Sequence, residues 1–135
     1  MKFSTRTTYG LRSMIRLAGG YGKENISLAS IAREENISPK YLERLFARLK
    51  KEKLITSEKG STGGYSLARD PKEITVFEIV KTLEGNMSPF HCLDESGKIY
   101  CSSKCKCGAT SVLVKVQHAV NSTLKGIKLS ELKAE

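Results

Sequence analysis

The stretch from Ser27 to Lys51, SLASIAREENISPKYLERLFARLKK, constrains the fold of this chain more than any other. Ser27 can cap a first helix, whose apolar residues then recur at helical spacing. Ser38 followed by Pro39 predicts the start of a second helix, because the serine hydroxyl accepts an unpaired amide hydrogen bond and proline fits the first helical position. The pattern therefore predicts two short helices joined by a tight turn.

The second of these helices has two chemically different faces. One face is apolar, with positions i, i+3, i+4 and i+7 expected to be buried, and consists of Leu42, Leu45, Phe46 and Leu49. The other face is polar and mostly cationic, and consists of Lys40, Tyr41, Arg44, Arg48 and Lys51.

A helix with such a cationic face fits the major groove of DNA, and the first helix would then cross the phosphate backbone. The residues expected nearest the base edges are Ser38, Lys40, Tyr41 and Arg44. A basic helix pair is also common as a solvated hairpin, so the pair alone leaves both interpretations open.

The residues that follow predict a glycine-rich β-hairpin. Two short extended runs, 54–56 and 65–67, flank a turn that contains Gly60, Gly63 and Gly64. The tip is small or cationic, which lets it approach sugar and phosphate in a minor groove, and carries Lys59, Ser61 and Thr62. Two helices, a turn and a hairpin together predict a winged helix-turn-helix.

Three further helices are expected, at 5–20, 75–85 and 109–125. The last has a broad apolar stripe at the end of a small domain, and the same helix of a second copy is its expected partner. A homodimer would place two recognition helices about one DNA turn, roughly 34 Å, apart. The alternative is that this helix folds back on its own core.

The expected fold class is mainly α with a small β wing. It comprises a winged helix-turn-helix DNA-binding domain at 1–85, a cysteine-rich sensor loop at 86–108, a long C-terminal dimerisation helix at 109–127 and a tail at 128–135. Apolar runs are too short to cross a membrane, and we expect a cytoplasmic protein.

The positive charge is concentrated in the first half of the chain. Residues 1–70 hold 14 Lys and Arg against 7 Asp and Glu, whereas residues 71–135 hold 9 against 7. This asymmetry fits a polyanion partner, because basic side chains release counterions from phosphates on binding. The charge asymmetry supports the DNA interpretation, which rests mainly on the helix-turn-helix motif.

All four cysteines lie within 16 residues, and they are Cys92, Cys101, Cys105 and Cys107. A cytosolic DNA-binding protein keeps its thiols reduced, so the cluster predicts metal or redox chemistry rather than disulfides. Thiolates suit iron-sulfur clusters, zinc or copper(I). The spacing lacks the paired CxxC units of a zinc ribbon, which disfavours structural zinc.

The whole chain resembles the Rrf-two family of bacterial winged-helix transcription regulators. The matching stretches are MKFSTRTTYGLRSM, ISPKYLERLFARLKKEKLI, GSTGGYSLARDP, ITVFEIVKTLEG and IKLSEL. The resemblance implies a homodimer, joined through the C-terminal helix, that binds a double-stranded DNA operator and usually represses transcription.

The family's cluster-binding members carry three cysteines before the last helix. The resemblance places these on Cys92, Cys101 and Cys107 and implies an iron-sulfur cluster, predicted to be 2Fe-2S. The histidine expected as fourth ligand is replaced by Thr110. Other candidates for that ligand are Cys105, His91 and His118.

Glu43 matches an acidic position that tunes the choice of DNA site in these members. Its carboxylate can accept a hydrogen bond from a cytosine amino group while repelling phosphate. The alternative is an intrahelical ion pair with Lys40 or Arg48.

Three other interpretations compete with the cluster sensor. The same cysteines can act as a metal-free thiol switch. The chain can instead resemble the family's cysteine-metabolism repressors, which lack the cysteine triad and are thought to respond through a protein partner. An enzyme is disfavoured, because the sequence offers no nucleophile and base pair and no phosphate-binding loop.

Overall fold

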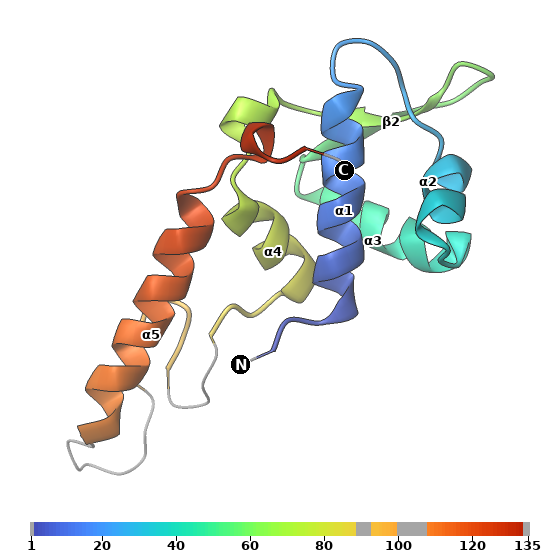
Figure 1. The fold of residues 1–135 in the computed structure, drawn as a ribbon. Coiled ribbons are helices and arrows are strands. Elements are labelled where there is room, and N and C mark those ends of the chain that lie inside the picture. Colours follow the sequence, from blue (N-terminus) through green and yellow to red (C-terminus); the bar gives the residue numbers. More distant parts are fainter. Residues whose placement is uncertain (1, 89–92, 100–107, 134–135) are drawn as a thin grey trace.

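The structure of this protein is a computed structural model that describes residues 2–88, 93–99 and 108–133. Its helices and strands are α1 (Thr5–Gly19), α2 (Leu28–Glu35), α3 (Pro39–Lys51), β1 (Ile55–Glu58), β2 (Gly64–Leu67), α4 (Val76–Glu84) and α5 (Gly108–Lys125), with short 3-10 helices η1 (Pro71–Glu73) and η2 (Leu129–Glu131). This order confirms the mainly α fold with a small β wing, and Figure 1 shows the arrangement.

The start of each helix in the α2–α3 pair is set by the serine that precedes it. The Ser27 hydroxyl accepts the Ser30 amide hydrogen bond at 3.1 Å, and the Ser38 hydroxyl accepts that of Tyr41 at 3.4 Å. Asn36 ends α2 in the left-handed conformation with φ of 54°, which its short polar side chain tolerates. These caps confirm the expected tight turn.

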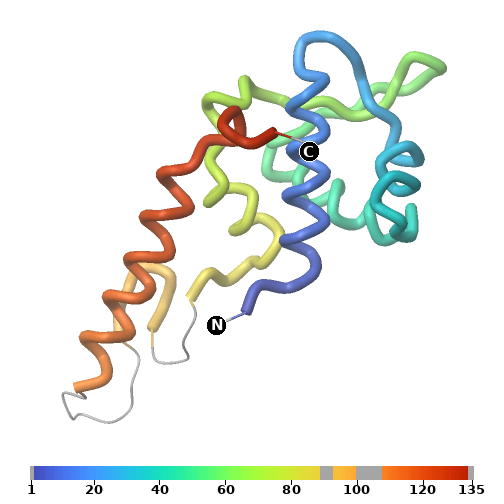
Figure 2. The backbone as a smooth tube through the Cα atoms, in the orientation of Figure 1, coloured from blue at the N-terminus to red at the C-terminus, as the bar shows by residue number. Residues whose placement is uncertain are grey.

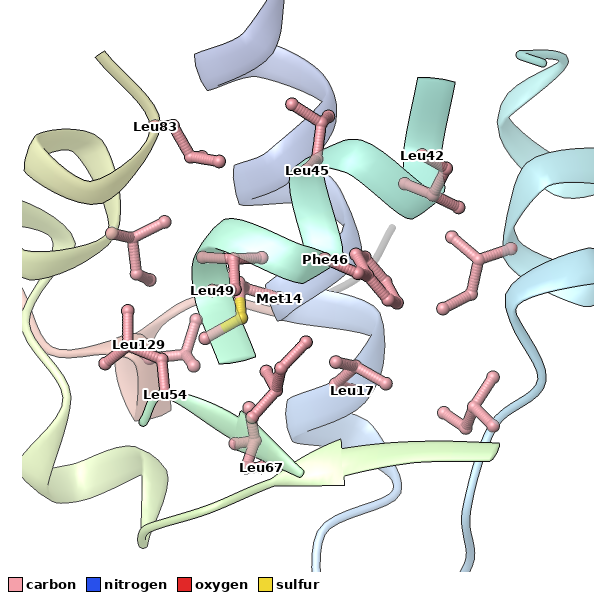
Figure 3. Packing of buried hydrophobic residues seen from close by; sticks show 14 of the residues in the cluster. Met14, Leu17, Leu42, Leu45, Phe46, Leu49, Leu54, Leu67, Leu83 and Leu129 are labelled. Atoms are coloured by element: carbon pink, nitrogen blue, oxygen red, sulfur yellow. The ribbon is translucent and has the colours of Figure 1, made fainter. Parts of the chain in front are cut away.

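The apolar face of α3 lies at the centre of the core (Figure 3). Its four expected core residues are buried against Met14 and Leu17 of α1, Leu83 of α4 and Leu67 of the hairpin. Phe46 also meets Tyr65 of β2 edge to face, with ring centroids 4.7 Å apart. The apolar face of α3 is therefore packed against α1, α4 and the hairpin.

The hairpin pairs Ile55 with Leu67 and Glu58 with Gly64 in antiparallel register. Ile26, just before α2, adds a bridge to Tyr65 through two backbone hydrogen bonds of 2.9 and 2.8 Å. Gly64 allows this close approach, because its φ is 142° and a Cβ there would lie 2.7 Å from the Ile26 carbonyl oxygen. The wing is thus joined to the start of α2.

The helix α5 extends away from the other helices (Figures 1 and 2), and the chain after it returns to the core. The Leu129 amide donates to the Ile74 carbonyl at 2.8 Å, and the Leu129 side chain is fully buried. The segment expected as a tail therefore packs against the domain, where η2 lies beside η1 and α1 and the Leu129 side chain joins the core.

Candidate DNA-binding surface and cysteine segment

The α2–α3 pair and the hairpin lie on the side of the molecule opposite α5 (Figure 1). Apart from Pro39 in the first turn, the exposed residues of α3 form one face, and they are Lys40, Glu43, Arg44, Ala47, Arg48, Lys50 and Lys51. Ala47 lies in the middle of this face, where its small side chain lets the helix axis approach a groove. The structure therefore groups these cations on a rigid helix.

Two of the residues that the sequence predicted to face DNA make contacts with other helices of the domain. The ring of Tyr41 is half-buried and meets Tyr9 of α1 edge to face, with centroids 6.2 Å apart. The Arg48 guanidinium donates to the Leu83 carbonyl at 3.1 Å. Both contacts have a clear cause, because an aromatic ring gains from burial and the C-terminal carbonyls of α4 attract a cation.

Glu43 is exposed on α3 between Lys40 and Arg44. Within the described ranges, no lysine or arginine comes within ion-pair distance of its carboxylate. The alternative of an intrahelical pair with Lys40 or Arg48 is therefore absent from this structure, and the carboxylate faces outward.

The tip residues of the wing are all exposed, and they are Lys59, Ser61 and Thr62. Asn25 holds the base of the tip, since its amide Nδ2 donates to Glu58 Oε2 at 3.1 Å and to the Thr62 carbonyl at 3.3 Å. Sequence reasoning did not single out Asn25. A lone asparagine in a connection has no periodic pattern that could have revealed this contact.

All four cysteines, together with His91, lie outside the described residues, but the turn at 93–99 lies between two of them in the sequence. Leu93 and Ile99 form an antiparallel bridge. The carboxylate of Asp94 accepts the amides of Ser96 and Lys98 at 2.9 and 2.8 Å. The two ends of this turn therefore lie side by side.

No three His, Cys, Asp or Glu side chains gather at metal-binding distance among the residues that the structure describes. Thr110 is half-buried in the first turn of α5. His118 is exposed, lies 3.4 Å from the Ser122 hydroxyl and is separated from Gly108 by about 15 Å of helix. This placement favours a surface role for His118.

The Rrf2 family model, described as an iron-dependent transcriptional regulator, matches residues 3–135. The chain belongs to the Rrf2 (Rrf-two) family. It is 43% identical over 95 residues to the HTH-type transcriptional regulator CymR of Bacillus subtilis, which covers 70% of this chain and 69% of that protein. It is 30% identical over 132 residues to the HTH-type transcriptional regulator IscR of Sodalis glossinidius, with 98% and 78% covered.

Solved structures give the same family. CymR, the global cysteine regulator of B. subtilis, matches with a TM-score of 0.82 and 33% identity, covering 97% of this chain and 95% of that chain. The oxidized form of Staphylococcus aureus CymR matches with a TM-score of 0.80 and 34% identity, covering 100% and 98%. The Rrf2 chain is therefore a transcription regulator with a winged-helix fold, and not an enzyme. Among its described helices, none has the length and apolar character to cross a bilayer.

Proposed function

We propose that this Rrf2 chain is a homodimeric repressor that reads a double-stranded DNA operator and whose affinity for DNA depends on the state of its cysteine segment. The observation that carries the proposal is the exposed face of α3. It presents Lys40, Arg44 and Lys51 on a helix whose other face is fully buried. A helix fits the major groove of B-DNA, where Arg and Lys can pair with guanine and Glu43 can accept from cytosine.

The wing completes the proposed interface. Lys59 at its tip is exposed beside the small hydroxyl residues Ser61 and Thr62. Contacts from these residues to phosphate and sugar fix the register of a protein on the duplex without reading its sequence. Specificity is therefore assigned to α3 and positioning to the wing.

The proposed dimer contact is the apolar stripe of α5. Val112, Val116 and Ala119 recur at i, i+4 and i+7, and Val112 retains 57% of its surface. Among the described residues of α5, only Gln117 is buried. An apolar helix face left in water favours association, and a second copy of this chain presents the same face.

A cluster is the first proposed signal. Four thiols within 16 residues are a donor set that suits iron and sulfide. The proposed ligands are Cys92, Cys101 and Cys107, with Cys105 as the fourth. A bound 2Fe-2S cluster supplies one-electron redox chemistry and sensitivity to oxygen. The match to IscR over nearly the whole chain, and the iron-dependent description of the family, support this assignment.

A metal-free signal is the second candidate. The 43% identity to CymR, a cysteine regulator by name, and the match to its oxidized form favour it. In this version the same thiols respond by oxidation, or a protein partner binds the dimer. The proposed binding of α3 to DNA is the same whether the signal is a cluster or is metal-free.

Purification without oxygen separates the two signals. Visible absorption with iron and sulfide in matched amounts supports the cluster, and Cys101→Ala then abolishes the colour. A protein that stays colourless after reconstitution with iron and sulfide overturns the cluster and leaves the thiol or partner signal. DNA binding is measured on the same samples. The proposed DNA interface is therefore tested even if the protein proves to hold no cluster.

A further inference from the structure

An amide from the segment before α2 contacts the tip of the wing. The Asn25 Nδ2 donates to Glu58 Oε2 at 3.1 Å and to the Thr62 carbonyl at 3.3 Å. Glu58 is the last residue of β1, and Thr62 lies in the turn that joins β1 to β2. These two hydrogen bonds, called the tip tether below, therefore hold the end of the hairpin that lies farthest from the core.

The backbone next to Asn25 connects the tip tether to the helix pair. Ile26 bridges Tyr65 of β2, and Figure 1 shows this segment passing along the hairpin. Gly64 permits the approach because it has no Cβ. Ser27 then caps α2. Asn25 thus lies two residues before the cap and reaches past β2 to β1, so the tip is linked directly to the start of α2.

The base of the wing is fastened to α3 by other contacts. Lys50 Nζ donates to Ser57 Oγ at 2.7 Å, and Phe46 packs edge to face on Tyr65. These contacts do not involve Asn25. Loss of the tip tether should therefore free the tip alone and leave the base of the hairpin on α3.

The turn at the tip, residues 59–63, depends on such support. It contains Gly60, with φ of 104°, and Gly63, whose amide donates to the Gly60 carbonyl at 3.1 Å. Glycine gives a turn many alternative conformations, and a two-stranded hairpin alone is only marginally stable in water. A contact from outside the hairpin therefore restricts the conformations of the tip.

We propose that Asn25 is a positioning residue of the DNA interface, which orders the wing tip before DNA binds. The inference deepens the proposed function, on which it rests for the contact of Lys59 with DNA. With the tip tether in place, Lys59 is presented from a turn that is already ordered, and binding loses less conformational entropy. Without it, DNA has to order the turn, and the contact of Lys59 with phosphate is weakened.

A neutral substitution tests this role through the salt dependence of DNA binding. Asn25→Ala removes the tip tether but removes no charge. It is expected to lower affinity for a selected duplex about threefold to tenfold. It should also bring the salt slope to that of Lys59→Ala, lower by about 1 for each wing on the duplex. A residue that served only the stability of the fold would leave this slope unchanged.

Double variants show whether Asn25 acts through Lys59. In the Lys59→Ala background, Asn25→Ala should change affinity by less than about twofold, because the contact that it positions is already gone. In the Arg44→Ala background, the loss of about threefold to tenfold should remain, because α3 and the wing bind different parts of the duplex.

The matched control is Thr56→Val, within the same hairpin. It removes the hydrogen bond between the Thr56 and Ser66 hydroxyls, which are 3.1 Å apart, and leaves the tip tether intact. Affinity and salt slope should stay within about twofold and about 0.3 of the unsubstituted chain. Thermal unfolding of each variant shows that it is folded.

Hydrogen exchange of the free protein gives a readout that needs no DNA. Asn25→Ala should speed exchange of the Gly63 amide about fivefold or more, whereas Thr56→Val should leave it within about twofold.

Three results would overturn the inference: unchanged affinity and slope in Asn25→Ala, an equal loss in Thr56→Val, or a full further loss in the Lys59→Ala background. A chain that selects no duplex contradicts the proposed function instead. Exchange of the Gly63 amide still tests the tip tether in that case, and an unchanged rate in Asn25→Ala would show that Asn25 does not order the tip.

Discussion

At the scale of single residues, Glu84 fixes the N-terminal end of α1. Its Oε1 accepts the Ser4 amide at 2.9 Å, the Ser4 hydroxyl at 2.6 Å and the Thr7 hydroxyl. Burial raises the pKa of Glu84, but these hydrogen bonds outweigh burial, and its pKa lies below the usual value. The charged carboxylate is therefore favoured in the folded state.

Glu84→Gln should lower the free energy of unfolding at pH 7 by about 1 to 2 kcal/mol, because charged acceptors form the stronger hydrogen bonds. Because the pKa of Glu84 is lowered in the folded state, the charged carboxylate stabilises the fold at pH values above the unfolded-state pKa of 4.5. This stabilisation is lost as the pH falls through the folded-state pKa. Urea unfolding should show the two proteins converging as pH drops below 4.5. Glu24→Gln, at an exposed carboxylate, is the control. A constant difference down to pH 3 would contradict the assignment.

Residue contacts of this kind were beyond prediction from the sequence. The Ser38–Pro39 pair gave a local signal for the start of α3, and the structure confirms it. Glu84 and Ser4 are 80 positions apart, and Arg48 and Leu83 are 35 apart. No local pattern links such pairs, because the contacts exist only after α1, α3 and α4 have packed together.

At the scale of elements, Gly10 sets how closely α1 and α4 approach. A Cβ at Gly10 would lie 2.2 Å from Leu83 Cδ1, and Leu83 is fully buried. Gly19, at the other end of α1, has no atom within 4 Å of the same position. Substituting alanine at Gly10 therefore tests the close packing of α1 on α4, whereas the same substitution at Gly19 tests helix propensity alone.

Gly10→Ala should destabilise the protein by about 1 to 3 kcal/mol, because the added methyl forces Leu83 out of its packed position. Gly19→Ala should be neutral or slightly stabilising, since alanine favours helix by up to about 1 kcal/mol relative to glycine. Thermal and urea unfolding of both variants measure the contrast. Equal effects in the two variants would show that α1 and α4 do not meet as described.

The elements themselves were predictable, because each has a local pattern. Helical periodicity gave α1, α3, α4 and α5, and glycines between two extended runs gave the wing. The return of the chain after α5 was not predictable. Leu129 belongs to a short segment without periodicity, and its burial depends on packing against α1 and η1, which lie far away in the sequence.

At the scale of the whole molecule, the proposed dimer places a second copy of the chain against α5. Ala119→Asp places a charge on the proposed contact face, whereas Ser122→Asp places one on the polar face of the same helix. Sedimentation equilibrium should show a monomer for Ala119→Asp and a dimer for Ser122→Asp, because burying an unpaired carboxylate opposes association. A dimer in both variants would show that the dimer interface does not include the face of α5 that carries Ala119.

The candidate site was predictable in part. The cationic face of α3 followed from periodicity and is present in the structure, whereas the half-buried Tyr41 and the bonded Arg48 depended on contacts with α1 and α4. The turn at 93–99 has no periodic signal. Its position between two helices depends on contacts of Asp94 with the distant Gln117 and of Glu95 with Lys81.

The first measurement is the salt dependence of binding to duplex DNA selected from fragmented genomic DNA. The logarithm of the binding constant should fall linearly with the logarithm of salt concentration, and Lys51→Ala should reduce the slope by about 1. Arg44→Ala should weaken binding to the selected duplex by about 1 to 3 kcal/mol, while Lys72→Ala, on η1, leaves affinity and slope unchanged. Failure to select any duplex, or equal losses of DNA affinity in Arg44→Ala and Lys72→Ala, would contradict the proposal that α3 reads DNA.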